Sequence, residues 1–86
     1  MHEFIWLPRF KRNYQKLPLE IRQRTHQTFA LMEKDLHHPS LQVKRIRGTI
    51  NIWEARITHC YRITFSLEGR TIILRTIGEH DVLKNP

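Results

Sequence analysis

The first half of the chain places its apolar residues at helical spacing, after one short apolar strand. Residues 3–7 are aromatic and β-branched, which predicts a strand that ends at Pro8. Apolar side chains then recur at i, i+4 and i+7, on one face of a short helix that ends at Pro18: Phe10, Tyr14 and Leu17. A second helix is predicted over residues 19–37, with one mostly apolar stripe: Ile21, Thr25, Thr28, Phe29, Met32 and Leu36. The two helices should form a hairpin with an apolar inner face.

From Leu41 onward the apolar pattern changes to the alternation that is typical of strands. Residues 41–47 are basic, and form either a ragged strand or a loop before a turn at Gly48-Thr49. Three strands are predicted near residues 50–57, 60–67 and 70–77, with Glu68-Gly69 as a two-residue turn. The pattern therefore predicts an α+β domain in the order β-α-α-β-β-β, with the helix hairpin packed on one face of a small antiparallel sheet.

Counting outward from the two predicted turns assigns the side chains that share a face of the sheet. With Glu68-Gly69 as the turn, the cross-strand partners are Leu67–Arg70, Phe65–Ile72, Ile63–Leu74 and Tyr61–Thr76. With residues 58–60 as the preceding loop, the partners are Ile57–Tyr61, Ala55–Ile63 and Trp53–Phe65. One face is then apolar apart from Thr76, so we expect it to pack on the helices.

The opposite face of the predicted sheet is polar and basic. In this register Arg56 lies opposite Arg62, and Arg62 lies opposite Arg75, which places three arginines in a row. Like charges directly opposite each other destabilise a sheet, so such a row favours an anionic ligand, and guanidinium groups bind phosphate bidentately. The alternative is a solvated basic face, in which an ion pair with Glu54 absorbs one of the charges.

Composition indicates the charge of the partner. The 86 residues include 15 Lys and Arg against 8 Asp and Glu, a formal charge of +7, which predicts an anionic partner such as RNA, DNA or an acidic protein. Both halves of the chain carry the excess, so the basic groups belong to the folded body. Three isoleucines are expected on the polar face, partly exposed, where they suit a protein partner: Ile52, Ile73 and Ile77.

Length and composition also predict the type of molecule. Residues 1–86 fit one domain. A single cysteine, Cys60, allows no internal disulfide and favours a reducing compartment. No apolar run approaches the roughly 18 residues that a membrane span needs, so we expect a cytoplasmic protein without membrane contact.

Three short motifs resemble the RelE/ParE superfamily of bacterial toxins. They are Trp53-Glu54-Ala55-Arg56, then Tyr61-Arg62, then Gly78-Glu79-His80-Asp81, and the first follows the basic segment Lys44-Arg45-Ile46-Arg47-Gly48. Preceded by a strand and two helices, this order and spacing cover nearly the whole chain. The resemblance implies a toxin of a toxin–antitoxin pair: an mRNA interferase that inhibits translation by cutting mRNA on the 70S ribosome, and that an acidic antitoxin holds inactive.

The resemblance also assigns residues. Arg56 and Arg62 match arginines of the family's strands, the latter often a phosphate binder, and His80 matches a terminal catalytic histidine. The basic residues nearby are expected to bind RNA: Lys44, Arg45, Arg47 and Arg75. Many active members carry an aromatic residue near the C-terminus, where this chain has Val82 after Asp81. That departure leaves open a non-cleaving toxin that inhibits DNA gyrase, or a plain RNA- or ribosome-binding domain.

The residues suit RNA cleavage by the 2′-hydroxyl. Arg56 and Arg62 would stabilise the charge that grows on the phosphorus oxygens. A histidine such as His80 is a natural general acid or base near neutral pH, and Glu54 is the best carboxylate for the opposite proton transfer. Asp81 would orient His80. The scheme requires no metal or cofactor, and the six histidines show no convincing ligand spacing.

Overall fold

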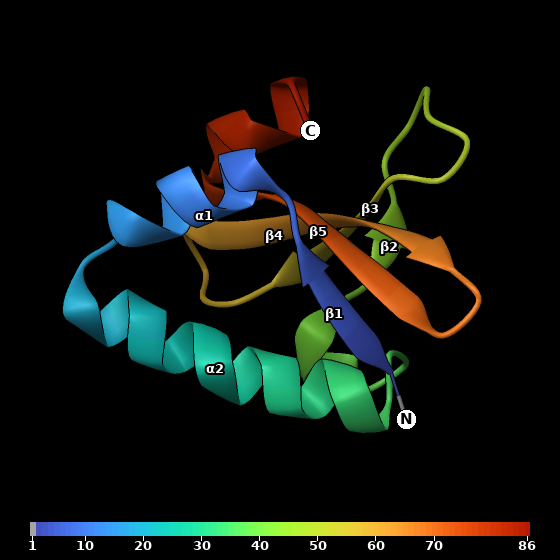
Figure 1. Cartoon of the computed structure of the whole chain (residues 1–86), viewed down its shortest axis with the longest axis horizontal. Coiled ribbons are helices and arrows are strands. Elements are labelled where there is room, and N and C mark those ends of the chain that lie inside the picture. Colours follow the sequence, from blue (N-terminus) through green and yellow to red (C-terminus); the bar gives the residue numbers. More distant parts are fainter. Residues whose placement is uncertain (1) are drawn as a thin grey trace.

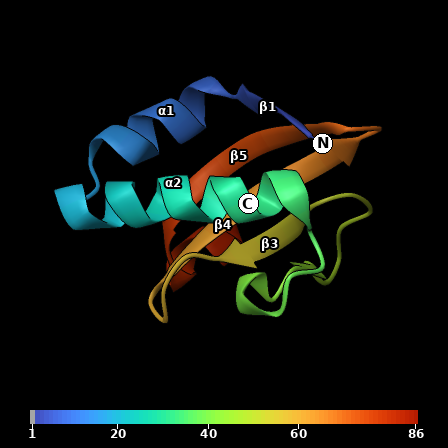
Figure 2. The same ribbon diagram turned by 90° about the horizontal axis from the view of Figure 1, so that it is seen from below.

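A computed structural model describes residues 2–86 as a sheet with helices on one face (Figure 1). The elements are β1 (Glu3–Trp6), α1 (Pro8–Gln15), α2 (Leu19–Lys34), the 3₁₀ turn η1 (Pro39–Leu41), β2 (Lys44–Arg45), β3 (Trp53–Arg56), β4 (Tyr61–Glu68), β5 (Thr71–Glu79) and the 3₁₀ turn η2 (His80–Lys84). Helix α2 crosses the sheet, and α1 lies beside it (Figure 2). The predicted α+β class and the order of elements are confirmed.

The sheet is mixed, because its first strand runs parallel to its last. The strand order is β1-β5-β4-β3-β2, and every neighbouring pair except β1 with β5 is antiparallel. The prediction of a purely antiparallel sheet was wrong in this respect. The prediction paired the later strands as hairpins and assigned no partner to β1. The partner of β1 is β5, which follows both helices and the other strands in the sequence.

Three helix boundaries differ from the predicted ones, and one of them is the end of α1, which lies at Gln15 and not at Pro18. Pro8 is the first residue of α1, where its missing N–H costs no hydrogen bond, so it begins the helix as well as ending the strand. Helix α2 ends at Lys34, three residues before the predicted end. Asp35 is extended, and its carboxylate accepts a hydrogen bond of 2.9 Å from the main-chain N–H of His37. Short polar side chains compete with the helix in this way.

The predicted register of β3 and β4 is confirmed. Trp53 pairs with Phe65, Ala55 with Ile63, and Arg56 with Arg62. The main-chain N–H of Ile57 donates to the carbonyl of Tyr61 at 3.0 Å, which closes the loop at residues 58–60 as expected.

The predicted register of β4 and β5 was wrong at the turn. Glu68 pairs with Thr71, so the two turn residues are Gly69 and Arg70. Gly69 has a φ of +59°, and Arg70 is not among the residues with positive φ. This is the pattern of a type II′ hairpin turn, which needs glycine at its first central position. Counting from Glu68-Gly69 therefore misassigned every partner on β5.

A β-bulge shifts the register a second time. Phe65 pairs with Leu74 but Thr64 pairs with Thr76, so Arg75 has no partner on β4. The extra residue sends Ile77 into the core, where it is 2% exposed, and places Thr76 on the opposite face. Arg62 faces Gly78. The predicted row of three arginines and the predicted exposed Ile77 were therefore wrong, and only the Arg56–Arg62 pair of the row exists.

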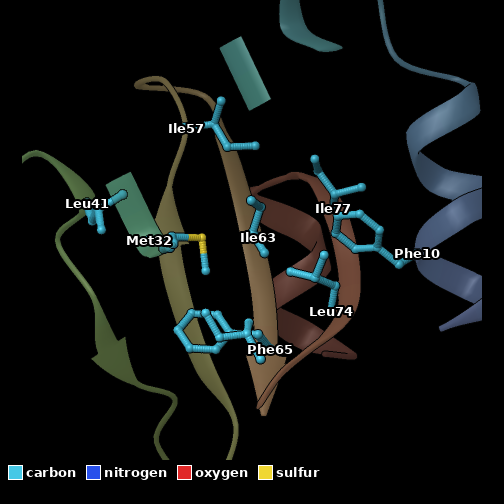
Figure 3. Close-up of a cluster of buried hydrophobic side chains, with 10 residues drawn as sticks. Phe10, Met32, Leu41, Ile57, Ile63, Phe65, Leu74 and Ile77 are labelled. Carbon is cyan, nitrogen blue, oxygen red and sulfur yellow. The ribbon is translucent and has the colours of Figure 1, made fainter. Parts of the chain in front are cut away.

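The core fills the space between the sheet and the helices (Figure 3). Its buried apolar residues come from both layers: Phe10, Met32, Leu41, Ala55, Ile57, Ile63, Phe65, Ile72, Leu74 and Ile77. Trp6 joins the layers at one edge, because its ring lies 4.9 Å from that of Phe10 and 5.6 Å from that of Phe29. The opposite face of the sheet is not covered by α2 (Figure 1).

Candidate nucleic-acid interface

The sheet face away from α2, here called the outer face, gathers three of the predicted catalytic residues. Glu54 and Arg56 alternate with core residues along β3, so both lie on this face. Arg62 lies beside them on β4, directly opposite Arg56. The register alone thus brings a carboxylate and two guanidinium groups together on adjacent strands.

Arg62 is the anchor of the loop between β3 and β4. Its Nη1 donates to the carbonyl oxygens of Thr58 at 2.7 Å, His59 at 3.1 Å and Tyr61 at 3.1 Å. Its Nε lies 3.7 Å from Oε1 of Glu54, and the two side chains are only 12% and 11% exposed. Little of Arg62 is open to a ligand, so it positions the loop, and Glu54 in turn holds Arg62.

Arg62→Ala should lower the free energy of unfolding by about 1–3 kcal/mol, because it leaves the largely buried Glu54 carboxylate without its partner. Arg62→Lys should recover part of the loss, since it restores the charge without the planar fork. Urea denaturation of the two variants and the wild type measures the difference. Equal stability of all three would contradict the anchoring role.

Arg56 is more available than Arg62. It is partly exposed, and its Nη2 lies 3.2 Å from Nδ1 of His59. A guanidinium group can only donate, so Nδ1 accepts and the neutral ring carries its proton on Nε2. His59 is exposed, as expected, but its hydrogen bond to Arg56 was not predicted. The sequence did contain a signal for this contact. The loop between β3 and β4 is so short that His59 must lie close to the end of β3, where Arg56 is.

The end of the chain lies on the outer face. The main-chain oxygen of Pro86 accepts hydrogen bonds from Thr64 Oγ1 at 3.3 Å and from Arg75 Nε at 3.1 Å. The hydroxyls of Thr64 and Thr76 bond to each other, and both residues are fully buried. Arg75 therefore holds the C-terminal segment. Figure 1 shows that segment on the side of the sheet opposite α2.

His80 follows the end of β5, beside α1. It is exposed and begins η2, two residues after Gly78, the partner of Arg62. A β-carbon on Gly78 would lie 2.8 Å from Val82 Cγ1, so glycine is what allows η2 to fold back onto the sheet here. Within residues 2–86 no hydrogen bond or ion pair joins His80 to Glu54, Arg56, Arg62 or Asp81.

The basic segment before β3 divides between the two faces. Lys44 pairs with Glu54 and so belongs to the outer face, whereas Arg45 pairs with Trp53 and belongs to the other. Nη1 of Arg45 donates to the carbonyl of Thr49 at 3.4 Å, and Arg47 is exposed in the turn. The structure therefore brings one of these three basic residues to the candidate site.

A small apolar area lies on the outer face, mainly on its β1–β5 side. Ile5 on β1 is 49% exposed and pairs with Ile73 on β5, which is partly buried. Ile52 is also partly buried, just before β3. Two of the three isoleucines expected to be partly exposed are therefore so, and Ile77 is not.

Other kinds of site were also sought. Within the described part of the chain, no group of three or more His, Cys, Asp and Glu side chains is placed to hold a metal ion. Nor does any helix among residues 2–86 have the length and apolarity to cross a membrane.

The order and packing of these elements define the fold of the RelE-type toxins. A RelB–RelE antitoxin–toxin complex from Methanococcus jannaschii matches with a TM-score of 0.77 at 23% identity, over 94% of this chain and 95% of that chain. A copper-bound mutant toxin from Helicobacter pylori matches with a TM-score of 0.80 at 18% identity, over 96% and 99%. The intact E. coli RelBE toxin–antitoxin complex matches with 0.74 at 11%, over 92% and 96%.

The comparisons confirm the predicted resemblance at the level of the fold. No family model and no curated protein matches the sequence. At the identities of the structural matches, the shared fold does not assign an activity, which depends on the residues of the site.

Proposed function

We propose that this chain is the toxin of a toxin–antitoxin pair and that it cuts mRNA on the ribosome as a metal-independent endoribonuclease. The observation that carries the proposal is the outer face of a RelE-type fold, which holds Glu54, Arg56 and Arg62 together, with His80 just beyond the end of β5. The net charge of +7 supports an RNA ligand, and mRNA and ribosomes place the activity in the cytoplasm.

The proposed reaction is attack of a ribose 2′-hydroxyl on the adjacent phosphorus, with departure of the 5′-oxygen. Arg56 and the Nε2–H of His59 are the donors most open to the phosphate, where charge grows in the transition state. His80, which is exposed, takes or gives one of the two protons that move in this reaction, and solvent water exchanges the other. Glu54 is 8% exposed and faces Arg62, so we assign it to positioning rather than to the base role expected from the sequence.

An acidic antitoxin is the proposed protein partner. Several of the matching structures are antitoxin–toxin complexes, including those from Methanococcus jannaschii and E. coli. Here Ile5 and Ile73 supply apolar area on the β1–β5 side of the outer face, and Arg56 and Lys44 supply positive charge on its β3–β2 side. This combination suits a protein with both acidic and apolar side chains. Such a partner would cover the outer face and block access of RNA.

Expression of the wild-type chain alone should arrest bacterial growth and translation, because the uncovered site would cut mRNA. Growth rate and amino-acid incorporation after induction measure the effect, with soluble protein quantified in the same cells. Arg56→Ala, expressed at an equal level, is the matched control and should permit growth. Normal growth at high soluble expression of the wild type would count against a toxin.

A binding-only toxin, of the kind that inhibits DNA gyrase, is the second candidate. The observation in its favour is that, within the described residues, no hydrogen bond or ion pair joins His80 to Arg62 or Glu54. Such a protein would need the basic face but not His80. Growth arrest that persists in His80→Ala, without RNA cleavage in the wild type, would select it.

A further inference from the structure

Helix α1 carries an uninterrupted basic surface outside the site described above. Three residues of α1 and its C-cap residue are exposed and basic, with no acidic residue among residues 8–17: Arg9, Lys11, Arg12 and Lys16. Arg9, Arg12 and Lys16 are spaced i, i+3 and i+7, so they form one stripe about 10 Å long. We call these three residues the α1 stripe.

No carboxylate of the described residues forms an ion pair with the α1 stripe, although Glu79 and Asp81 line one cavity with Lys16. Over residues 2–86 the ion pair within 4.0 Å is that of Glu54 and Arg62, so none of the stripe residues has such a partner. Helix α2 differs, since its Glu20 lies four residues before Arg24, a spacing that favours pairing.

The stability of α1 does not account for all of this charge. Arg12 and Lys16 lie near the C-terminal end of the helix, where a positive charge is favourable. Arg9 lies in the first turn, where a positive charge is unfavourable and where α1 has no acidic residue. Arg12 and Lys16 also repel each other at i, i+4. A ligand that requires positive charge explains the whole stripe.

The α1 stripe leads to the candidate site. Helix α1 packs on β5, with Phe10 in the core and Asn13 Oδ1 accepting a hydrogen bond of 3.4 Å from the N–H of Ile77. Beside this contact, Lys16 and His80 line one cavity of about 630 Å³, together with Tyr61. Figure 1 shows the turn η2, which begins at His80, next to α1. A strand that passes His80 would thus meet Lys16 next.

We propose that the α1 stripe is a second phosphate-binding surface, which holds the backbone of an RNA strand beyond the outer face. The inference rests on the proposed function, because it takes RNA as the ligand. The exposed side chains of α1 other than Pro8 are all polar or charged, whereas a protein interface has an apolar centre. Contacts of this kind are made to phosphates, so the surface should bind without sequence preference.

The test compares two triple variants that remove the same charge. Arg9→Gln/Arg12→Gln/Lys16→Gln removes the α1 stripe, and Arg24→Gln/Lys34→Gln/Arg70→Gln removes three exposed basic residues elsewhere. Each lowers the formal charge by three, from +7 to +4. The probes are 2′-O-methyl RNAs of about 4 and about 16 nucleotides. They lack the attacking hydroxyl, so cleavage does not disturb the measurement of affinity against salt concentration.

For the longer RNA, the slope of log affinity against log salt should fall by about 2 in the stripe variant and by less than 1 in the control variant. For the shorter RNA the two variants should differ little. Equal losses in both variants with the longer RNA would overturn the proposal, as would weakened binding of an acidic antitoxin by the stripe variant with RNA affinity unchanged.

Cleavage of unmodified RNA by the wild type separates this proposal from the proposed function. If the wild type cuts RNA while the two triple variants lose equal affinity, the stripe proposal alone fails. If affinity depends on the α1 stripe and the wild type never cuts, the stripe proposal stands and the cleavage activity fails.

Discussion

His80→Ala should lower the single-turnover rate of RNA cleavage by roughly 10²–10⁴-fold while most of the RNA affinity remains. The substitution removes the proposed proton carrier, whereas the phosphate is held by other side chains. His80 is exposed and outside the core, so the variant should stay folded. Rates are measured with enzyme in excess, affinity is measured separately with uncleavable RNA, and circular dichroism confirms the fold.

A matched control is His37→Ala. His37 is also exposed, but it lies beyond the C-terminal end of α2, away from the outer face. It should cut RNA at the wild-type rate. If His80→Ala also cut at that rate, the proposed role of His80 would be wrong.

Arg56→Ala should slow cleavage by roughly 10²–10³-fold, because it removes a donor aimed at the charge of the transition state. Unlike His80→Ala, it should also weaken RNA binding, since the guanidinium meets the same phosphate in the ground state. Arg56→Lys should be intermediate, because it keeps the charge but loses the planar fork and the geometry of the bond to His59.

Arg70→Ala serves as the control for loss of one arginine charge, because Arg70 is exposed in the turn between β4 and β5. It should behave like the wild type in single-turnover cleavage. If Arg56→Ala and Arg70→Ala had equal effects, Arg56 would contribute only to the overall charge of the protein.

The register of β3 and β4 was predictable because it depends on local features. A tight loop joins two alternating segments, and shifting the pairing by one residue would turn Ile63 and Phe65 toward solvent. The burial of apolar side chains therefore fixes the pairing, and with it the meeting of Arg56 and Arg62.

The register of β4 and β5 was not predictable by the same counting. Two candidate turns contain Gly69, and only the pairing of Glu68 with Thr71 identifies it as the first central residue. The bulge at Arg75 then changes which side chains face the core. Alternation in the sequence does not mark a bulge, so Thr76 and Ile77 were assigned to the wrong faces.

The sequence predicted which side chains of the candidate site share a face of the sheet, but not which contacts they make. The alternating pattern placed Glu54 and Arg62 on the outer face. It did not indicate that Nη1 of Arg62 donates hydrogen bonds to three main-chain carbonyl oxygens at the loop. It also missed that Arg75 binds Pro86. Such contacts depend on where side chains and chain ends lie in space, which the spacing of residues does not determine.

The measurement that tests the central claim most directly is cleavage of a defined mRNA by the purified wild-type chain, with and without ribosomes, in the presence of a metal chelator. Attack by the 2′-hydroxyl predicts products with a 2′,3′-cyclic phosphate and a 5′-hydroxyl. Without ribosomes, the chelator should not change the rate of cleavage. With ribosomes, the chelator concentration is kept low enough to leave their magnesium bound, and the rate should again be unchanged. Both products should form far more slowly in Arg56→Ala and His80→Ala. No cleavage under any of these conditions, or products with a 5′-phosphate, would contradict the account.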